Sequence, residues 1–161
     1  MSRNSFGFTM VEMMVVLIIL GMVAAVAVPS ITSSLDEMKI DGAAREVVSA
    51  ISYCQSIAIK EGEDYKVNFN EVQERFKCDN VVTSLTTLHP VDRKPYNIDF
   101  KLAGQFQGVD IVDASFFPGN KSDITFNSLG EPNRTGTVTL DYNGYQKTIG
   151  ISGLLGEISV N

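Results

Sequence analysis

One acidic residue, Glu12, lies at the start of the most apolar segment of the chain. It follows Gly7-Phe8-Thr9 and leads directly into the uncharged stretch 13–28. An ionised carboxylate at the membrane end of a helix costs about 2 to 3 kcal/mol unless a cation meets it. Cleavage after Gly7 would supply that cation, because Phe8 would then carry a new α-amino group. In a polymer this amine could neutralise Glu12 of a neighbouring subunit, so the spacing predicts assembly.

The segment 7–12, Gly-Phe-Thr-Met-Val-Glu, follows a short leader that contains Arg3 and precedes an apolar helix. This arrangement resembles the N-terminus of the type IV pilin and pseudopilin superfamily. The resemblance implies that a prepilin peptidase cuts between Gly7 and Phe8, and that Phe8 becomes the N-methylated first residue of the mature chain. It also implies that Glu12 is needed for methylation and for docking of the subunit.

Two other interpretations of the N-terminal segment remain open. Arg3, the apolar core and the run 25–27 (Ala-Val-Ala) also resemble a secretory signal, whose removal would release a soluble exported binding domain beginning at Val28. Glu12 argues against this interpretation, because it would interrupt the apolar region without benefit. A single-pass anchor is the second alternative, since residues 8–28 would form about 31 Å of helix, roughly one bilayer core.

Arg3 is the only charged residue before the apolar helix. By the positive-inside tendency it favours a cytoplasmic N-terminus, which places the rest of the chain in the periplasm. The resemblance implies a bacterial inner-membrane protein that is later extracted into a pilus or pseudopilus. Its expected partners are prepilin peptidase, other pilin or pseudopilin subunits, the inner membrane and an assembly platform.

The periodicity of apolar residues changes along the chain. After Pro29 they recur at steps of three and four, which predicts an amphipathic helix to about Gly62. From Asp64 onward the period falls to two, which predicts strands. The resemblance implies the pilin fold, an α+β architecture with a long N-terminal helix packed on a C-terminal antiparallel β domain. The 161 residues then divide into a leader (1–7), a transmembrane or filament-core helix (8–28), its amphipathic continuation (29–62) and a periplasmic β domain (63–161).

Two residues mark a predicted break in the long helix, Gly21 and Pro29. The resemblance implies that the helix loosens between them in filaments. The segment 34–37, Ser-Leu-Asp-Glu, also has the pattern of a capping box, so a second helix could begin there. The alternative is that Pro29 only kinks a continuous helix at the membrane exit.

The C-terminal third carries a second resemblance. Asn143-Gly144 is the strongest short hairpin signal in the chain, and it lies between the segments 124–130 (Ile-Thr-Phe-Asn-Ser-Leu-Gly) and 155–160 (Leu-Gly-Glu-Ile-Ser-Val). Together these segments resemble the GspH/FimT group of minor pseudopilins and minor pilins. Gly130 and Gly156 are expected at turns that need a positive φ, with no ligand.

The chain has two cysteines, Cys54 and Cys78. No CxxC motif or His/Cys cluster predicts a metal site. In an oxidising periplasm a disulfide is favoured; it would close a loop of about 25 residues and stabilise the fold by roughly 3 kcal/mol. The alternative is a pair of reduced, buried thiols that behave as small apolar residues.

No catalytic constellation is visible, so we expect no enzymatic activity, cofactor or small-molecule substrate. His89 is the only histidine, and it is expected in a solvent-facing loop with no nucleophile beside it. Asp141 begins a faint resemblance to a calcium loop that lacks its downstream glutamate. Asp110 and Asp113 are isolated acids, which are usually solvated, so we expect no metal.

The charge argues against nucleic-acid binding, because the net value is −6 at pH 7. Arg93-Lys94 and Arg134 are too sparse for an electrostatic footprint, and the segment 153–157 contains one acid and no arginine. A DNA-uptake pilin is therefore only an alternative. The sequence predicts a structural minor pilin or pseudopilin, assembled into a type II secretion pseudopilus or a type IV pilus.

Overall fold

A computed structural model describes residues 7–153 and 155–161, without the side chains of residues 26–31. The chain forms two compact units, Met1–Leu35 and Asp36–Asn161. Among the described residues, one α-helix, α1, runs from Met10 to Glu61, and eight strands follow it. Gly62 follows the helix and terminates it, because its φ of 70° is the left-handed conformation common after a helix. Its N–H donates to the carbonyl of Ala58 at 2.9 Å.

In the first unit, every described side chain from Phe8 to Ala25 is exposed. The helix continues through Gly21 and Pro29, so the structure contains no break at these two residues. The capping interpretation of residues 34–37 was wrong, because these residues lie inside α1 and begin no second helix. Within the described part of the chain, no helix meets the length and mean hydropathy that a membrane span requires.

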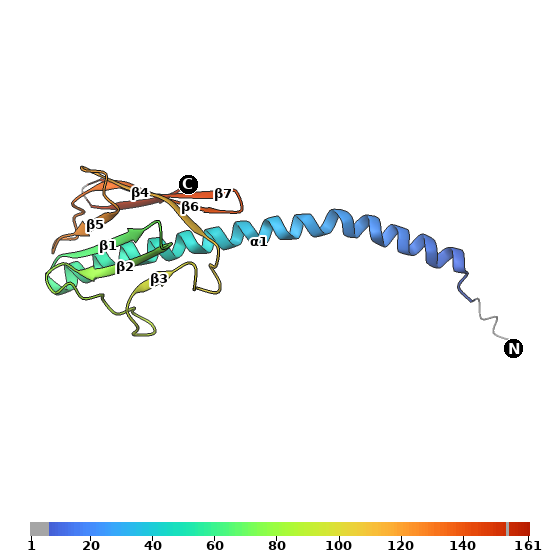
Figure 1. Ribbon diagram of the computed structural model, residues 1–161, viewed down its shortest axis with the longest axis horizontal. Coiled ribbons are helices and arrows are strands. Elements are labelled where there is room, and N and C mark those ends of the chain that lie inside the picture. The colour runs from blue at the N-terminus through green and yellow to red at the C-terminus, as the bar shows by residue number, and fades with distance from the viewer. Residues whose placement is uncertain (1–6, 154) are drawn as a thin grey trace. The chain divides into compact units, whose positions relative to one another are not determined.

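The second unit contains two four-stranded sheets, and every named strand pairing in them is antiparallel. The first sheet has the order β3-β2-β1-β5, and the second has the order β4-β6-β7-β8 (Figure 1). This arrangement confirms the predicted α+β class. The strands are β1 (Tyr65–Asn70), β2 (Arg75–Asn80), β3 (Asn97–Asp99), β4 (Asp110–Phe117), β5 (Asp123–Phe126), β6 (Thr135–Tyr142), β7 (Tyr145–Ser152) and β8 (Glu157–Val160).

The core of this unit is built on the inner face of α1. That face carries mostly small side chains, which allow the sheets to approach the helix closely: Ala43, Ala44, Val47, Ala50, Cys54 and Ala58, all essentially buried. Aromatic rings fill the space between the sheets. Phe69 lies 5.9 Å, centroid to centroid, from both Phe76 and Phe116.

Polar side chains of α1 also contact the second sheet and its preceding loop. Lys39 donates to the carbonyl of Gln107 at 2.6 Å, and its Nζ lies 4.2 Å from the ring centroid of Tyr142. Asp41 forms an ion pair with Lys147 on β7 at 3.0 Å. The helix is therefore bound to the β4-β6-β7-β8 sheet by charges at its margin as well as by apolar packing.

The predicted Asn-Gly hairpin is confirmed. Asn143 and Gly144 have φ values of 53° and 85°, and Tyr142 pairs with Tyr145 across them. Two positive φ values in a two-residue connection are typical of a type I′ turn, whose twist matches that of the flanking strands. This turn sets the β6–β7 register.

The edge of β4 is covered by two carboxylates from the β1–β2 turn. Glu74 Oε2 accepts a hydrogen bond from the N–H of Ile111 at 2.5 Å, and Glu71 Oε1 accepts one from the N–H of Ala114 at 3.0 Å. Burial, opposed by the Ile111 hydrogen bond and reinforced by the nearby Asp110 charge, raises the pKa of Glu74 above its usual value. These contacts occupy edge groups with which another strand could pair.

Candidate assembly site

Thr9 and Glu12 form a capping box at the start of α1. Glu12 Oε2 accepts hydrogen bonds from the backbone N–H of Thr9 at 2.9 Å and from the Thr9 hydroxyl at 3.0 Å. In return, Thr9 Oγ1 accepts the backbone N–H of Glu12 at 3.2 Å. Two N–H groups that a helix start leaves without partners are thereby satisfied, and the carboxylate lies at the end of the helix dipole that favours negative charge.

The bond between Gly7 and Phe8 lies just outside the helix, in irregular backbone. The Phe8 side chain is 79% exposed, and no atom lies within 4 Å of the position that a Cβ on Gly7 would occupy. The bond between these two residues is therefore accessible and outside regular secondary structure. Residues 1–6 of the predicted leader, including Arg3, lie outside the described residues.

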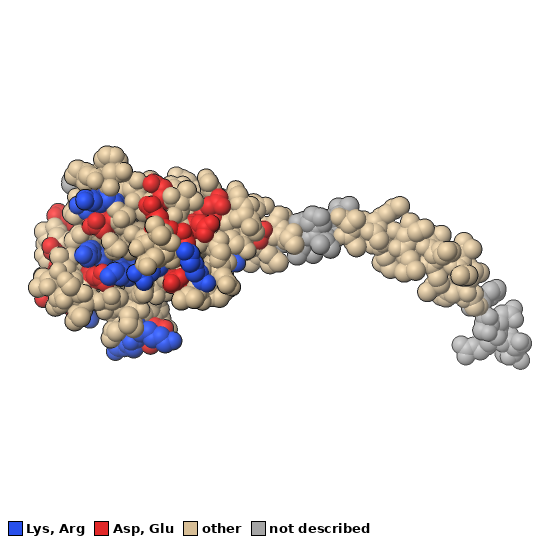
Figure 2. Space-filling view, in the orientation of Figure 1, with Lys and Arg blue, Asp and Glu red and all other residues tan. Residues whose placement is uncertain are grey.

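The apolar helix that follows the capping box has no covering in the isolated chain. Figure 2 shows both signs of charge gathered over the β domain, whereas the visible face of the described apolar segment is almost entirely without charge. Apolar surface of this extent marks a membrane or protein contact. Its exposed large side chains are Val11, Met13, Met14, Val15, Val16, Leu17, Ile18, Ile19, Leu20, Met22 and Val23.

The Gln55 side chain connects the two C-terminal segments 124–130 and 155–160. Gln55 Nε2, on α1, donates to the carbonyl oxygens of both Gly130 and Leu155 at 2.8 Å. Gly130 has a φ of +82°, and a Cβ there would lie 2.6 Å from Ile59 Cδ1. We name the two hydrogen bonds from Gln55 to Gly130 and Leu155 the Gln55 clamp. Sequence reasoning missed Gln55, because a glutamine at an intermediate position of an amphipathic helix carries no local signal of its partners.

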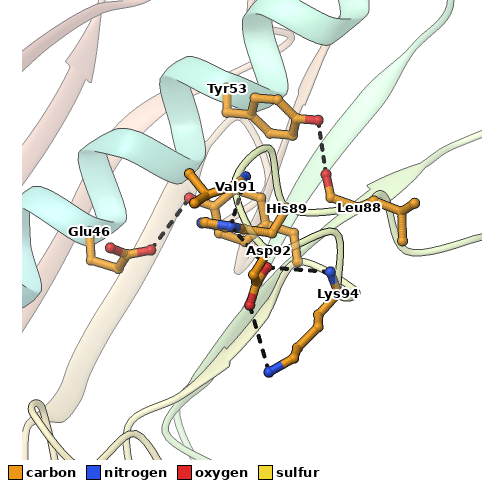
Figure 3. Close-up of polar contacts among 8 residues, drawn as sticks. Glu46, Tyr53, Leu88, His89, Val91, Asp92 and Lys94 are labelled. Atoms are coloured by element: carbon orange, nitrogen blue, oxygen red, sulfur yellow. Dashed lines mark hydrogen bonds and ion pairs between the residues drawn. The ribbon is translucent and has the colours of Figure 1, made fainter.

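His89 lies beside a cavity of about 300 Å³ on the domain surface. Its ring packs edge-on against Tyr96, with centroids 4.6 Å apart, and its Nδ1 lies 3.1 Å from Asp92 Oδ1. Figure 3 shows Glu46 and Tyr53 on α1 facing the loop that carries His89. The Tyr53 hydroxyl donates to the carbonyl of Leu88 at 2.9 Å. His89 lies in a loop, as predicted, and its side chain is 25% exposed.

Tyr96 lies between the loop that carries His89 and helix α1. Its hydroxyl lies 3.5 Å from Glu46 Oε1. Burial, opposed by a hydrogen bond with Ser49 and reinforced by the Glu46 carboxylate, raises the pKa of Tyr96 to about 12. Like an ordinary tyrosine, Tyr96 is protonated at neutral pH, and its hydroxyl donates to Glu46 Oε1.

The acids considered for calcium are spread along two strands. Asp110 on β4 lies opposite Asp141 on β6, and Asp113 accepts a hydrogen bond from the Ser115 hydroxyl at 2.9 Å. Among the described residues, no group of three or more His, Cys, Asp or Glu side chains could hold a metal ion.

Two of the basic residues considered for DNA binding, Lys94 and Arg134, have side-chain partners within the domain. Arg134 forms an ion pair with Asp123 at 3.0 Å and donates to the carbonyl of Pro118 at 3.1 Å. Lys94 Nζ lies 3.9 Å from Asp92 Oδ2. Arg134 therefore acts within the β domain, stabilising the segment around β5.

Two protein families match the chain, one at the N-terminal segment and one over the β domain and the helix that precedes it. The family described as "Prokaryotic N-terminal methylation motif" matches residues 2–28, and the family described as "Type II transport protein GspH" matches residues 43–155. No curated protein matches the chain.

Among solved structures, the chain is similar to the minor pseudopilin EpsH from the type 2 secretion system of Vibrio cholerae. The TM-score is 0.55 at 15% sequence identity, and the match covers 75% of this chain and 94% of EpsH. At this identity the likeness shows a shared fold. The GspH match spans more than half of the chain, and the methylation motif precedes it. The chain therefore belongs to the GspH family of type II transport proteins and carries the prokaryotic N-terminal methylation motif at its start.

Proposed function

We propose that this protein is a minor pseudopilin, assembled into the pseudopilus of a type II secretion system. The observation that carries the proposal is the Thr9–Glu12 capping box at the start of an exposed apolar helix. Such a helix needs a covering of lipid or of other helices, and its one carboxylate needs a cation once water is removed. A filament core of bundled helices supplies both.

Processing would complete the site. Cleavage after Gly7 leaves the Thr9 amide and hydroxyl intact, so the capping box persists in the mature chain. The new Phe8 amine of one subunit then pairs with Glu12 of its neighbour, and the apolar residues that follow pack against neighbouring helices. The role is structural rather than enzymatic, and the β domain selects the partner subunits.

Before assembly, the subunit resides in the bacterial inner membrane, with its N-terminus in the cytoplasm and its β domain in the periplasm. Prepilin peptidase removes the leader there, and an assembly platform extracts the mature subunit. Gly21 and Pro29 loosen the helix only inside the filament, where neighbouring helices can compensate for lost hydrogen bonds.

The first test is intact-mass and N-terminal peptide analysis of the protein purified from its native membrane. We expect a chain that begins with N-methylated Phe8. A substitution of Gly7 should block processing and leave a larger product on a gel. A mature chain that begins at Val28 would overturn the proposal, because the apolar helix would then be a discarded signal.

A type IV pilus is the competing assembly. The GspH match favours the pseudopilus. Deletion of the gene tests the choice directly, since loss of protein secretion with normal pili supports a pseudopilin. Loss of pili with normal secretion would instead support a minor pilin.

A further inference from the structure

Cys54 and Cys78 lie next to each other in the core of the β domain. Cys54 is on α1 and Cys78 is on β2, and their side chains are 0% and 1% exposed. Both are free thiols in this structure. The Cys78 side chain is close enough to interact directly with Cys54, and burial together with this neighbour raises the pKa of the Cys54 thiol.

The surroundings of the pair exclude the other common roles of paired cysteines. The Asp79 carboxylate acts on Cys54 through its charge. This carboxylate is already engaged by Lys77 at 2.7 Å and by the Thr86 hydroxyl at 2.8 Å. In the described part of the chain, the pair belongs to no cluster that could bind a metal. A buried thiol is also a poor nucleophile, because reactivity requires an accessible thiolate.

We propose that Cys54 and Cys78 are joined by a disulfide in the mature protein, which bonds helix α1 covalently to strand β2. Residues 54 to 78 contain the last turns of the helix, the whole of β1 and most of β2. Cys78 already pairs with Val67 through the backbone of the sheet. The disulfide would add a covalent link between this sheet and the helix, where side-chain packing otherwise dominates.

The oxidation balances by thiol–disulfide exchange. The two thiols lose two protons and two electrons and form one S–S bond, while one disulfide of a periplasmic thiol oxidant is reduced to two thiols. Because both sulfur atoms are buried in the folded domain, the exchange takes place while the domain folds, before α1 closes over the sheet. The finished disulfide would then be protected from reduction by the same burial.

This inference rests on the proposed function, because the domain must fold in an oxidising compartment. The test uses the full-length protein in its native inner membrane. Thiols are trapped by acid, the protein is denatured, and free thiols are labelled with a maleimide polymer before or after reduction. We expect no labelled thiol before reduction and two labelled thiols after it. Two labelled thiols without reduction would overturn the proposal.

Single variants calibrate the assay. Cys54→Ser and Cys78→Ser should each show one labelled thiol without reduction, because the remaining cysteine loses its partner. In the same cells, protease added to spheroplasts reports the compartment of the β domain. A digested domain with free thiols overturns the disulfide alone. A protected domain with free thiols overturns both the disulfide and the proposed membrane topology.

A stability measurement in detergent gives a second, independent readout. Loop-closure entropy predicts that reduction raises the unfolding equilibrium constant of the wild type by about 100-fold. The double variant Cys54→Ala/Cys78→Ala should be insensitive to reductant. Equal stability of the oxidised and reduced wild type would contradict the proposal.

Discussion

The carboxylate of Glu12 is held by Thr9 through two hydrogen bonds, at 2.9 Å to the backbone N–H and 3.0 Å to the hydroxyl. The residue proposed for docking between subunits therefore already has partners within its own chain. The two hydrogen bonds fix the position of the Glu12 carboxylate in the first turn of the helix. They do not neutralise its negative charge, which can still attract an amine. Capping and the proposed docking are two separate roles of one side chain, and substitutions can separate them.

Glu12→Gln and Glu12→Ala form the pair of variants that separates these functions. Glutamine can keep the hydrogen bond from the Thr9 N–H but has no charge. If a charge pair holds neighbouring subunits, both variants should enter filaments at least about tenfold less than the wild type, since breaking a buried pair costs about 3 to 5 kcal/mol. Co-purification with other pseudopilins measures incorporation, and membrane fractionation controls for insertion. Normal incorporation of Glu12→Gln would show that capping alone suffices.

Gly136 on β6 pairs with Phe116 on β4 and lies close to the β4 backbone. A Cβ on Gly136 would lie 2.0 Å from the carbonyl oxygen of Ser115, a backbone atom that cannot rotate away. We expect Gly136→Ala to destabilise the domain by about 2 to 4 kcal/mol, measured by chemical denaturation. Gly104→Ala is the matched control, because nothing lies within 4 Å of its Cβ position. A loss below about 0.5 kcal/mol for Gly136→Ala would contradict the close approach of the two strands.

The Gln55 clamp predicts a loss of stability when its amide donor is removed. Gln55→Ala deletes two hydrogen bonds to backbone carbonyls, and we expect a cost of about 1 to 3 kcal/mol. Gln55→Glu should cost at least as much at neutral pH, because it directs a carboxylate at the Gly130 and Leu155 oxygens. The exposed Gln146→Ala serves as control. Faster amide exchange in residues 127–131 of Gln55→Ala would locate the effect; unchanged exchange and stability would exclude the clamp.

Glu74 gives the domain a predicted dependence on pH. Burial, the dominant cause, raises its pKa, so the folded protein holds this proton more tightly than the unfolded chain does. Protonation therefore adds stability that is fully present below the unfolded pKa and is lost as the pH rises through the folded pKa.

Glu74→Gln should remove this contribution while keeping an oxygen to accept the Ile111 N–H. Denaturation from pH 4 to pH 8 should show the wild type losing stability relative to Glu74→Gln as the pH rises. The exposed Glu157→Gln is the control substitution. Parallel pH profiles of the wild type and Glu74→Gln would contradict the assignment.

The sequence was sufficient where a signal is local. The Asn143-Gly144 turn was predicted because both residues adopt a positive φ at low cost, and two alternating strands flank them. Strands β5 (Asp123–Phe126) and β8 (Glu157–Val160) follow the period of two that begins after Asp64, since each alternates apolar and polar residues and ends at turn residues. The N-terminal motif was recognisable because residue types at fixed spacing carry its chemistry.

Local signals misled where neighbouring structure could override them. Residues 34–37 have the pattern of a capping box, yet they lie inside α1. A capping side chain stabilises a helix start only where the preceding residues leave the helix, and here they remain helical. Strand β3 is limited to Asn97–Asp99, because the Asp99 side chain accepts the N–H of Lys101 at 2.8 Å and turns the chain.

By itself, the sequence determined the order of helix and strands, the apolar segment that needs a covering, and the N-terminal methylation motif. Only the tertiary structure decided that β5 pairs with β1, that Gln55 joins two distant loops, and that Cys54 lies against Cys78. The physical reason is the range of the interactions. Periodicity, turn conformation and capping act over a few residues, whereas strand pairing and burial join positions tens of residues apart whose contacts exist only once the chain has folded.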